Sequence, residues 1–76
     1  MQELMEQQLK TAIEDTLEVD VIVKDGSRIF GGLVAEAFTN GVLTGRDHEG
    51  STVLLQEDGI SGFIVHRQTP AWYSLD

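Results

Sequence analysis

The sequence predicts a mainly β fold, in which one N-terminal α-helix covers a strongly bent, five-stranded antiparallel barrel. The segment 19–24 has valine at each odd position, as a half-buried strand requires. Tight-turn dipeptides, Asp25-Gly26 and Asn40-Gly41, separate short apolar runs. A glycine pair, Gly31-Gly32, lies inside the second run, where glycine usually marks a bulge or a sharp bend. A long strand that bends at this pair predicts a small and highly curved barrel.

The helix is expected over residues 2–17. Apolar residues recur at helical spacing and form one face, which consists of Leu4, Met5, Leu9, Ala12, Ile13, Thr16 and Leu17. Glu3 and Glu6 lie in the first turn, where the helix dipole favours anions. A helix that binds a membrane surface would have a basic polar face, and this one is acidic. We therefore expect the apolar face to pack on the barrel of the same chain.

The rest of the barrel is expected to consist of short strands and tight turns, an order typical of a small SH3-like or OB-like barrel. After the first two strands, the predicted segments are a strand at Val42–Thr44, a loop at Asp47–Gly50, a strand at Ser51–Gln56, a turn at Glu57–Gly59 and a strand at Ile60–His66. The whole chain, 1–76, is predicted to be a single domain, with a helix at 2–17, a barrel at 18–66 and a tail at 67–76.

The fourth and fifth predicted strands are apolar on both faces. A domain of 76 residues has too little mass to cover both faces of an outer strand. Tight curling of the barrel under the helix is one explanation. Pairing of these strands with neighbouring subunits is the one we favour, because it removes an aggregation-prone edge and closes into a ring of roughly five to seven copies. The predicted interface consists of Val53, Leu54, Leu55, Ile60, Phe63, Ile64 and Val65.

Composition limits the partners and the compartment. The chain has no cysteine, which excludes disulfides and thiolate metal sites and is compatible with the cytoplasmic location that we expect. No apolar run approaches the roughly 20 residues of a membrane span, so no membrane association is expected. The net charge is −8, whereas nucleic-acid binders normally have a basic footprint. Such an acidic surface favours solubility or a basic protein partner.

Three short motifs, in the order of the predicted strands, resemble those of a known family. Gly31-x-Leu33 lies in the bent strand, Val42-Leu43 follows the next turn, and Asp58-Gly59-Ile60 lies where the last two strands meet. Together with the preceding helix, these motifs resemble the Sm-like family, which includes the LSm and Hfq-like branches. The resemblance extends from Leu4 to about Val65, which is nearly the whole chain.

The resemblance implies a fold, an assembly and a ligand. Sm-like proteins form closed rings when the fourth strand of one subunit pairs with the fifth strand of the next. Their usual activity is to bind single-stranded, often uridine-rich RNA around the pore. The implied RNA-binding residues come from the loop after the bent strand, from the last tight turn and from nearby cations, and they are Phe38, Thr39, Asn40, Glu57, Asp58, Gly59, Arg28 and Arg46.

The sequence departs from the family pattern at the implied RNA site. Ala37 stands where the family has an aspartate, and Glu57 and Asp58 stand where it has basic residues. Carboxylates at the mouth of a pore oppose phosphate groups. The function that the resemblance implies is still an RNA-binding ring that acts in RNA processing or regulation, and the alternative is an acidic ring-shaped module that binds protein and not RNA.

No enzyme, metal or cofactor is expected. The nearest approach to a set of metal ligands is Asp47-His48-Glu49 together with His66, but three adjacent loop residues project in different directions, which indicates a solvated loop. No serine and histidine have the spacing of a nucleophile and its base. Trp72 and Tyr73 in the tail are expected to form a strap over the barrel or over a neighbouring subunit.

Overall fold

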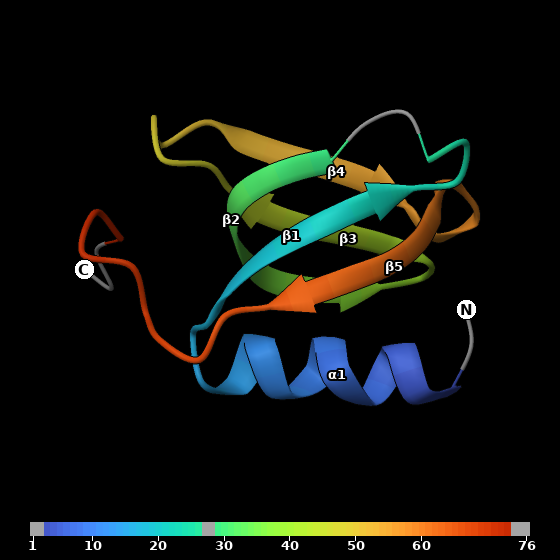
Figure 1. The fold of residues 1–76 in the computed structure, drawn as a ribbon, viewed down its shortest axis with the longest axis horizontal. Helices are drawn as coiled ribbons and strands as arrows, with labels where there is room; N and C mark the ends of the chain where they lie inside the picture. The colour runs from blue at the N-terminus through green and yellow to red at the C-terminus, as the bar shows by residue number, and fades with distance from the viewer. Residues whose placement is uncertain (1–2, 27–28, 74–76) are drawn as a thin grey trace.

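The computed structural model describes residues 3–26 and 29–73, and it confirms a mainly β chain with an N-terminal helix (Figure 1). Its five strands form one antiparallel sheet in the order β4-β3-β2-β1-β5. The elements are α1 (Glu3–Glu14), β1 (Glu18–Val23), β2 (Ile29–Thr39), β3 (Val42–Arg46), β4 (Thr52–Gln56), the 3₁₀ turn η1 (Glu57–Gly59) and β5 (Ile60–Val65).

The sheet is strongly curled, and its connections require this. The strands β4 and β5 form the two opposite edges of the sheet, yet only the three residues of η1 join them. Five strands in a flat sheet would separate its outer strands by roughly 19 Å, whereas a three-residue connection reaches at most about 14 Å. The two outer strands therefore approach each other at η1, and Figure 1 shows the curvature in the arc of β2.

The bend in β2 is a β-bulge at the glycine pair. Val19 pairs with Leu33 while Val21 pairs with Phe30, so two residues of β2 stand opposite one residue of β1. Gly32 has a φ of +69°, which L-residues with a side chain rarely adopt. Its N–H donates a hydrogen bond to Oδ1 of Asp20, the residue of β1 inside the bulge, at 3.0 Å. The predicted bend is confirmed, and its unusual backbone lies at Gly32.

The two predicted glycine turns have different outcomes. Asn40 and Gly41 have φ values of 54° and 77° and join β2 directly to β3, as a two-residue hairpin turn requires. The two-residue turn predicted at Asp25-Gly26 is wrong, because five residues separate β1 from β2. A turn closes there through the Gly26 N–H and the Val23 carbonyl, at 2.9 Å, before the chain continues to β2.

The helix is shorter than the predicted 2–17, and Gln2 lies outside the described residues. The last helical residue is Glu14, and Thr16 has a φ of 56°. The Leu17 N–H donates to the carbonyl of Ala12 and the Thr16 N–H to that of Ile13, the two bonds of a Schellman cap. Thr16 therefore ends the helix. At twelve residues α1 is too short to cross a membrane, and the described residues contain no other helix that could.

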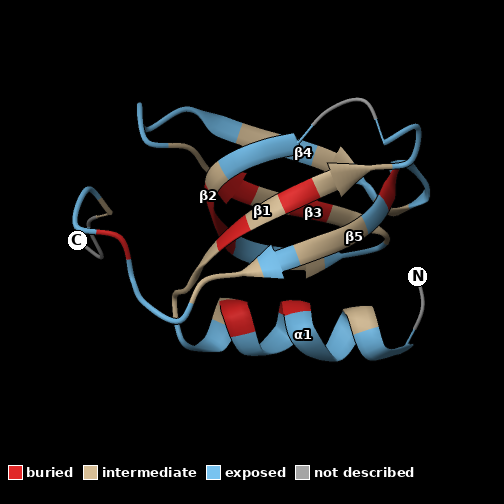
Figure 2. Ribbon diagram, in the orientation of Figure 1, coloured by how far each residue is buried: buried red, intermediate tan, exposed pale blue. Residues whose placement is uncertain are grey.

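The core lies between α1 and the concave face of the sheet (Figure 2). Leu4, predicted on the buried face of α1, is instead 61% exposed. Alternation in β1 is confirmed at Val19 and Val21, both of which are fully buried. The core cluster consists of Leu9, Ala12, Val19, Val21, Leu33, Ala35, Leu43 and Ile60.

Gly32→Ala should lower the free energy of unfolding by about 1–2 kcal/mol, because a Cβ at positive φ is strained. Gly31→Ala is the matched control. A Cβ there would lie 3.4 Å from Asp20 Oδ1, which is ordinary van der Waals contact. Urea unfolding of both variants at one protein concentration measures the difference. A Gly31 variant as unstable as the Gly32 variant would contradict this placement of the bend.

Candidate functional site

Two turns that the sequence separates meet in the fold. The Glu57 N–H donates a hydrogen bond to the Gly41 carbonyl at 2.8 Å, which holds η1 against the Asn40-Gly41 turn. Between the turns lies a cavity of about 290 Å³, lined by Asn40, Gly41, Val42, Gln56, Glu57 and Asp58. We call this place the turn junction, and five of the predicted RNA-site residues, Thr39, Asn40, Glu57, Asp58 and Gly59, lie at it or directly beside it.

Two other predicted RNA-site residues, Phe38 and Arg46, lie away from the turn junction. Phe38 packs against the core and lines a separate cavity of about 420 Å³ under α1. Arg46 ends β3, four residues beyond Val42, which places its backbone roughly 13 Å along the strand from the junction. Arg28 lies outside the described residues.

The turn junction carries negative charge. Among the described residues, its cavity is lined by two carboxylate side chains and by no basic one. The Glu57 carboxylate lies over Gly41, where a Cβ added to the glycine would come within 3.2 Å of Oε1. Lys24 is nearby, because its N–H donates to the Gly59 carbonyl at 2.9 Å, but it lines a neighbouring cavity. The junction can therefore accept hydrogen bonds and cations, and it offers phosphate groups little attraction.

The predicted interface residues divide into two groups. Ile60 is buried in the core of its own chain, and Val53, Leu55, Phe63 and Val65 pack partly against that core. The outward-facing members are Leu54, which is 66% exposed, and Ile64, which is 47% exposed. Each of these two lies on an outermost strand of the sheet.

The tail is held by a polar cluster that sequence reasoning did not identify. The Tyr73 hydroxyl donates to Oε2 of Glu36 at 2.6 Å, and Arg46 Nη2 lies 2.7 Å from the same oxygen. The Arg46 guanidinium also lies 4.7 Å from the centre of the Tyr73 ring. Trp72 contacts Tyr73 edge to face at 6.0 Å. Of the two expected places for the strap, the barrel of the same chain is the one that Tyr73 contacts, through Glu36 and Arg46.

This cluster shifts the pKa values of all three of its members, and the pKa of Arg46 is raised, first by its hydrogen bond to Glu36. The Tyr73 hydroxyl, and then Arg46, lower the pKa of Glu36 below 4.5. The hydrogen bond to Glu36, and then burial, raise the pKa of Tyr73 above 10.0. Because the pKa of Glu36 is lower in the folded chain, its contribution to docking is present above the unfolded value and is lost as pH falls through the folded one. The Tyr73 contribution is present below its ordinary pKa and is lost as pH rises through the folded value.

The loop 47–50 does not gather metal ligands. Asp47 Oδ1 accepts hydrogen bonds from the N–H groups of Glu49 and Ser51, both at 2.9 Å, so this carboxylate organises its own loop. His66 does not join the loop, because its imidazole lies 3.0 Å from Asp20 on β1. Within the described residues, the group that could hold a metal ion is Glu18, Asp20 and His66.

Comparison of the chain with models of protein families, with curated proteins and with solved structures found no match.

Acid should release the tail. As pH falls through the folded-state pKa of Glu36, which is lowered below its usual 4.5, protonation removes the negative charge that holds the Tyr73 hydroxyl and Arg46, and the Trp72 emission should shift to the red as its ring becomes more solvated. Tyr73→Phe is the matched control, since it keeps the ring and removes the hydroxyl. This variant should show the shifted emission already at neutral pH and a smaller response to acid. Equal responses of parent and variant would mean that this cluster does not hold the tail.

Proposed function

We propose that this chain is a self-assembling, ring-forming domain of the Sm-like type, in which the outer strands β4 and β5 of neighbouring copies pair. One observation carries the proposal. These two strands are the edge strands of the sheet, and each presents an exposed apolar side chain, Leu54 on β4 and Ile64 on β5. An apolar outer strand of this kind is a template for pairing with another chain.

The geometry of one chain supports a closed assembly. The pairing surface on β4 differs from that on β5, so the contact is head to tail, and such contacts close into rings or grow into filaments. The strong curl of the sheet turns each added copy through an angle, which favours closure. A ring of about five to seven copies agrees with the resemblance of the motifs around Gly31, Val42 and Gly59.

The ligand that the turn junction fits best is a basic segment of a protein. Glu57 and Asp58 from each copy would place about ten to fourteen carboxylates around a ring, where low-dielectric walls focus the field. Lysine and arginine side chains of a partner could pair with these carboxylates and with the amide of Asn40, which lines the same cavity.

Single-stranded RNA is the second candidate ligand. The Asn40-Gly41 turn contacts η1 through the Glu57 N–H and the Gly41 carbonyl. This contact favours RNA, because the resemblance assigns RNA recognition to these two segments. Thr39 and Asn40 could contact bases there, while Glu57 and Asp58 would repel the phosphates. The two ligands therefore predict opposite effects of charge at one pair of positions.

Leu54→Asp should dissociate the assembly, because it places an unpaired charge in the paired edge. Light scattering coupled to gel filtration should give a ring of several 8.4 kDa chains for the parent and a smaller species for the variant. Ile29→Asp is the matched control. Ile29 is also exposed, at 58%, but it lies on β2 in the middle of the sheet. A parent that runs as an 8.4 kDa monomer at micromolar concentration would refute the ring.

Reversing two charges at the turn junction should change ligand preference. The double variant Glu57→Lys, Asp58→Arg should lose affinity for a lysine- and arginine-rich peptide and gain well over tenfold for a uridine oligomer at low salt. Fluorescence anisotropy with both probes at several salt concentrations measures this.

Glu14→Lys with Asp15→Arg is the control for net charge, since these two exposed acids lie at the end of α1. The control should leave peptide binding within about threefold of the parent. Equal effects of the two double variants would show that the junction is not the site. Tight binding of uridine and no binding of the peptide by the parent would favour RNA as the ligand.

A further inference from the structure

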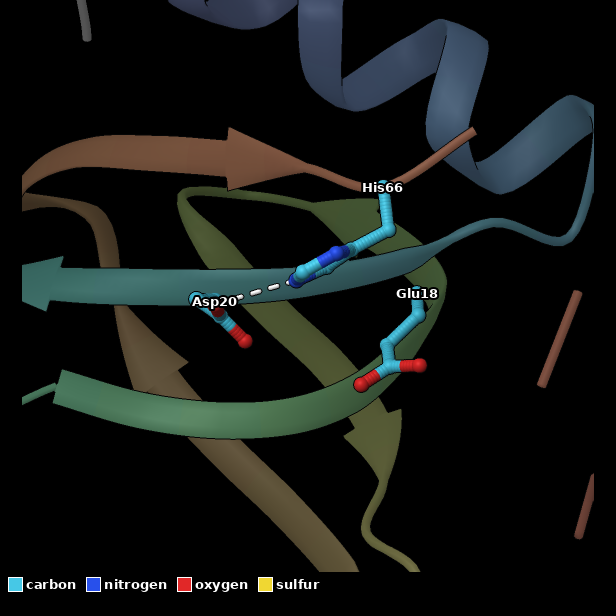
Figure 3. Close-up of side chains that lie close together, drawn as sticks. All are labelled: Glu18, Asp20 and His66. Carbon is cyan, nitrogen blue, oxygen red and sulfur yellow. Dashed lines mark hydrogen bonds and ion pairs between the residues drawn. The ribbon is translucent and has the colours of Figure 1, made fainter. Parts of the chain in front are cut away.

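Three side chains with metal-binding atoms gather on the face of β1 that points away from the core (Figure 3). Glu18 and Asp20 are two residues apart on β1, so they project to the same side, opposite to the buried Val19 and Val21. His66 directly follows β5, and its N–H donates to the Glu18 carbonyl at 2.8 Å. This bond continues the β1–β5 ladder and fixes the imidazole beside the two carboxylates.

The Asp20 carboxylate is held by one contact at each of its two oxygens. Asp20 Oδ1 accepts the Gly32 N–H at 3.0 Å, and Oδ2 lies 3.0 Å from Nε2 of His66. Both carboxylates also lie against the glycine pair of β2. A Cβ on Gly32 would lie 3.4 Å from Glu18 Oε2, and one on Gly31 would lie 3.4 Å from Asp20 Oδ1. The bulge therefore orients Asp20 and lies in contact range of both acidic side chains.

The spacing of the donor atoms suits a metal ion. One ligand atom from each of the three residues lies within 4.8 Å of the others. Metal–nitrogen and metal–oxygen bonds of about 2.1 Å place two adjacent ligands roughly 3.0 Å apart around an octahedral ion and roughly 3.4 Å apart around a tetrahedral one. The His66 and Asp20 atoms, 3.0 Å apart, lie at this spacing. Glu18 is partly exposed, so its side chain can move toward the other two ligands.

The chemistry of the donors selects a class of ion. An imidazole with two carboxylates is typical of zinc, manganese, cobalt or nickel, whereas magnesium and calcium prefer oxygen ligands alone. Two carboxylates face one imidazole here, so even a protonated imidazole would leave one negative charge without compensation. A divalent ion neutralises both carboxylates.

We propose that Glu18, Asp20 and His66 form a binding site for one divalent transition-metal ion of the zinc class. The ion would link β1 to the chain that leaves β5, and so fasten the outer strand β5 to its neighbour β1. This site is independent of the proposed function, since it involves neither the turn junction nor the outward residues of β4 and β5.

Calorimetric titration of the chain with zinc, and the visible absorption of its cobalt complex, test the proposal. The parent should bind one ion per chain, and its melting temperature should rise by at least about 5 °C with zinc at a hundredfold excess over Kd. His66→Gln and Asp20→Asn should each weaken binding at least tenfold. His48→Gln is the matched control, because it removes the other of the two histidines, which lies 3.8 Å from Glu49 in the exposed loop.

The outcomes separate the site from a plain ion pair. If His66 and Asp20 form only an ion pair, zinc should not bind the parent, or should bind all variants equally, and either result overturns the proposal. A loss in the His48 variant would place the ion in the loop and would also overturn it. Magnesium or calcium binding as tight as zinc would refute the assigned class of ion. Glu18→Gln, which keeps the Asp20–Gly32 hydrogen bond, serves if the Asp20 variant does not fold, and it too should weaken zinc binding at least tenfold.

Discussion

The bulge of β2 at Gly32 is the constraint on which the rest of the structure depends. A single eleven-residue strand pairs with β1 from Ile29 to Val34 and with β3 from Val34 to Thr39, and it turns at Gly32, within the part that pairs with β1. Without that turn, α1 and the sheet could not enclose a shared core, and the three residues of η1 could not join opposite ends of the sheet. The Asp20 carboxylate stabilises the turn through the N–H of Gly32, so one hydrogen bond supports the curvature.

Local sequence patterns predicted the hairpin turn and the buried face of β1, because both depend on the backbone conformation of neighbouring residues. The Asn40-Gly41 dipeptide was sufficient to predict a two-residue turn, because few other residues accept both φ values. The valines of β1 predicted its buried face for a similar reason, since side chains of a strand alternate. The end of the helix was less predictable, because Thr16 is a poor residue for a left-handed cap and its position there depends on hydrogen bonds to Ala12 and Ile13.

Contacts between distant residues could not be predicted in this way. His66 and Asp20 are 46 positions apart and meet through the β1–β5 register, whereas Tyr73 and Arg46 are 27 apart and meet because the tail docks on the end of β3. The need for glycine at position 45 also depends on a residue that is distant in the sequence. A Cβ there would lie 2.6 Å from the Val34 carbonyl, a close approach of two backbones that no turn signal marks. Of the RNA site implied by resemblance, the turn junction was assembled by the fold, while Phe38 and Arg46 were engaged elsewhere.

The strand β5 pairs with β1, which is distant from it in the sequence, and this affects the order in which the strands can form. Its partner β1 precedes it by about forty residues, so their pairing must close a long loop, whereas β1–β2, β2–β3 and β3–β4 join neighbours in sequence. The four-stranded part can therefore form early, and β5 docks late. Until the C-terminal third has been synthesised, the open edge of β1 and the apolar residues that β5 later covers stay accessible to other nascent chains.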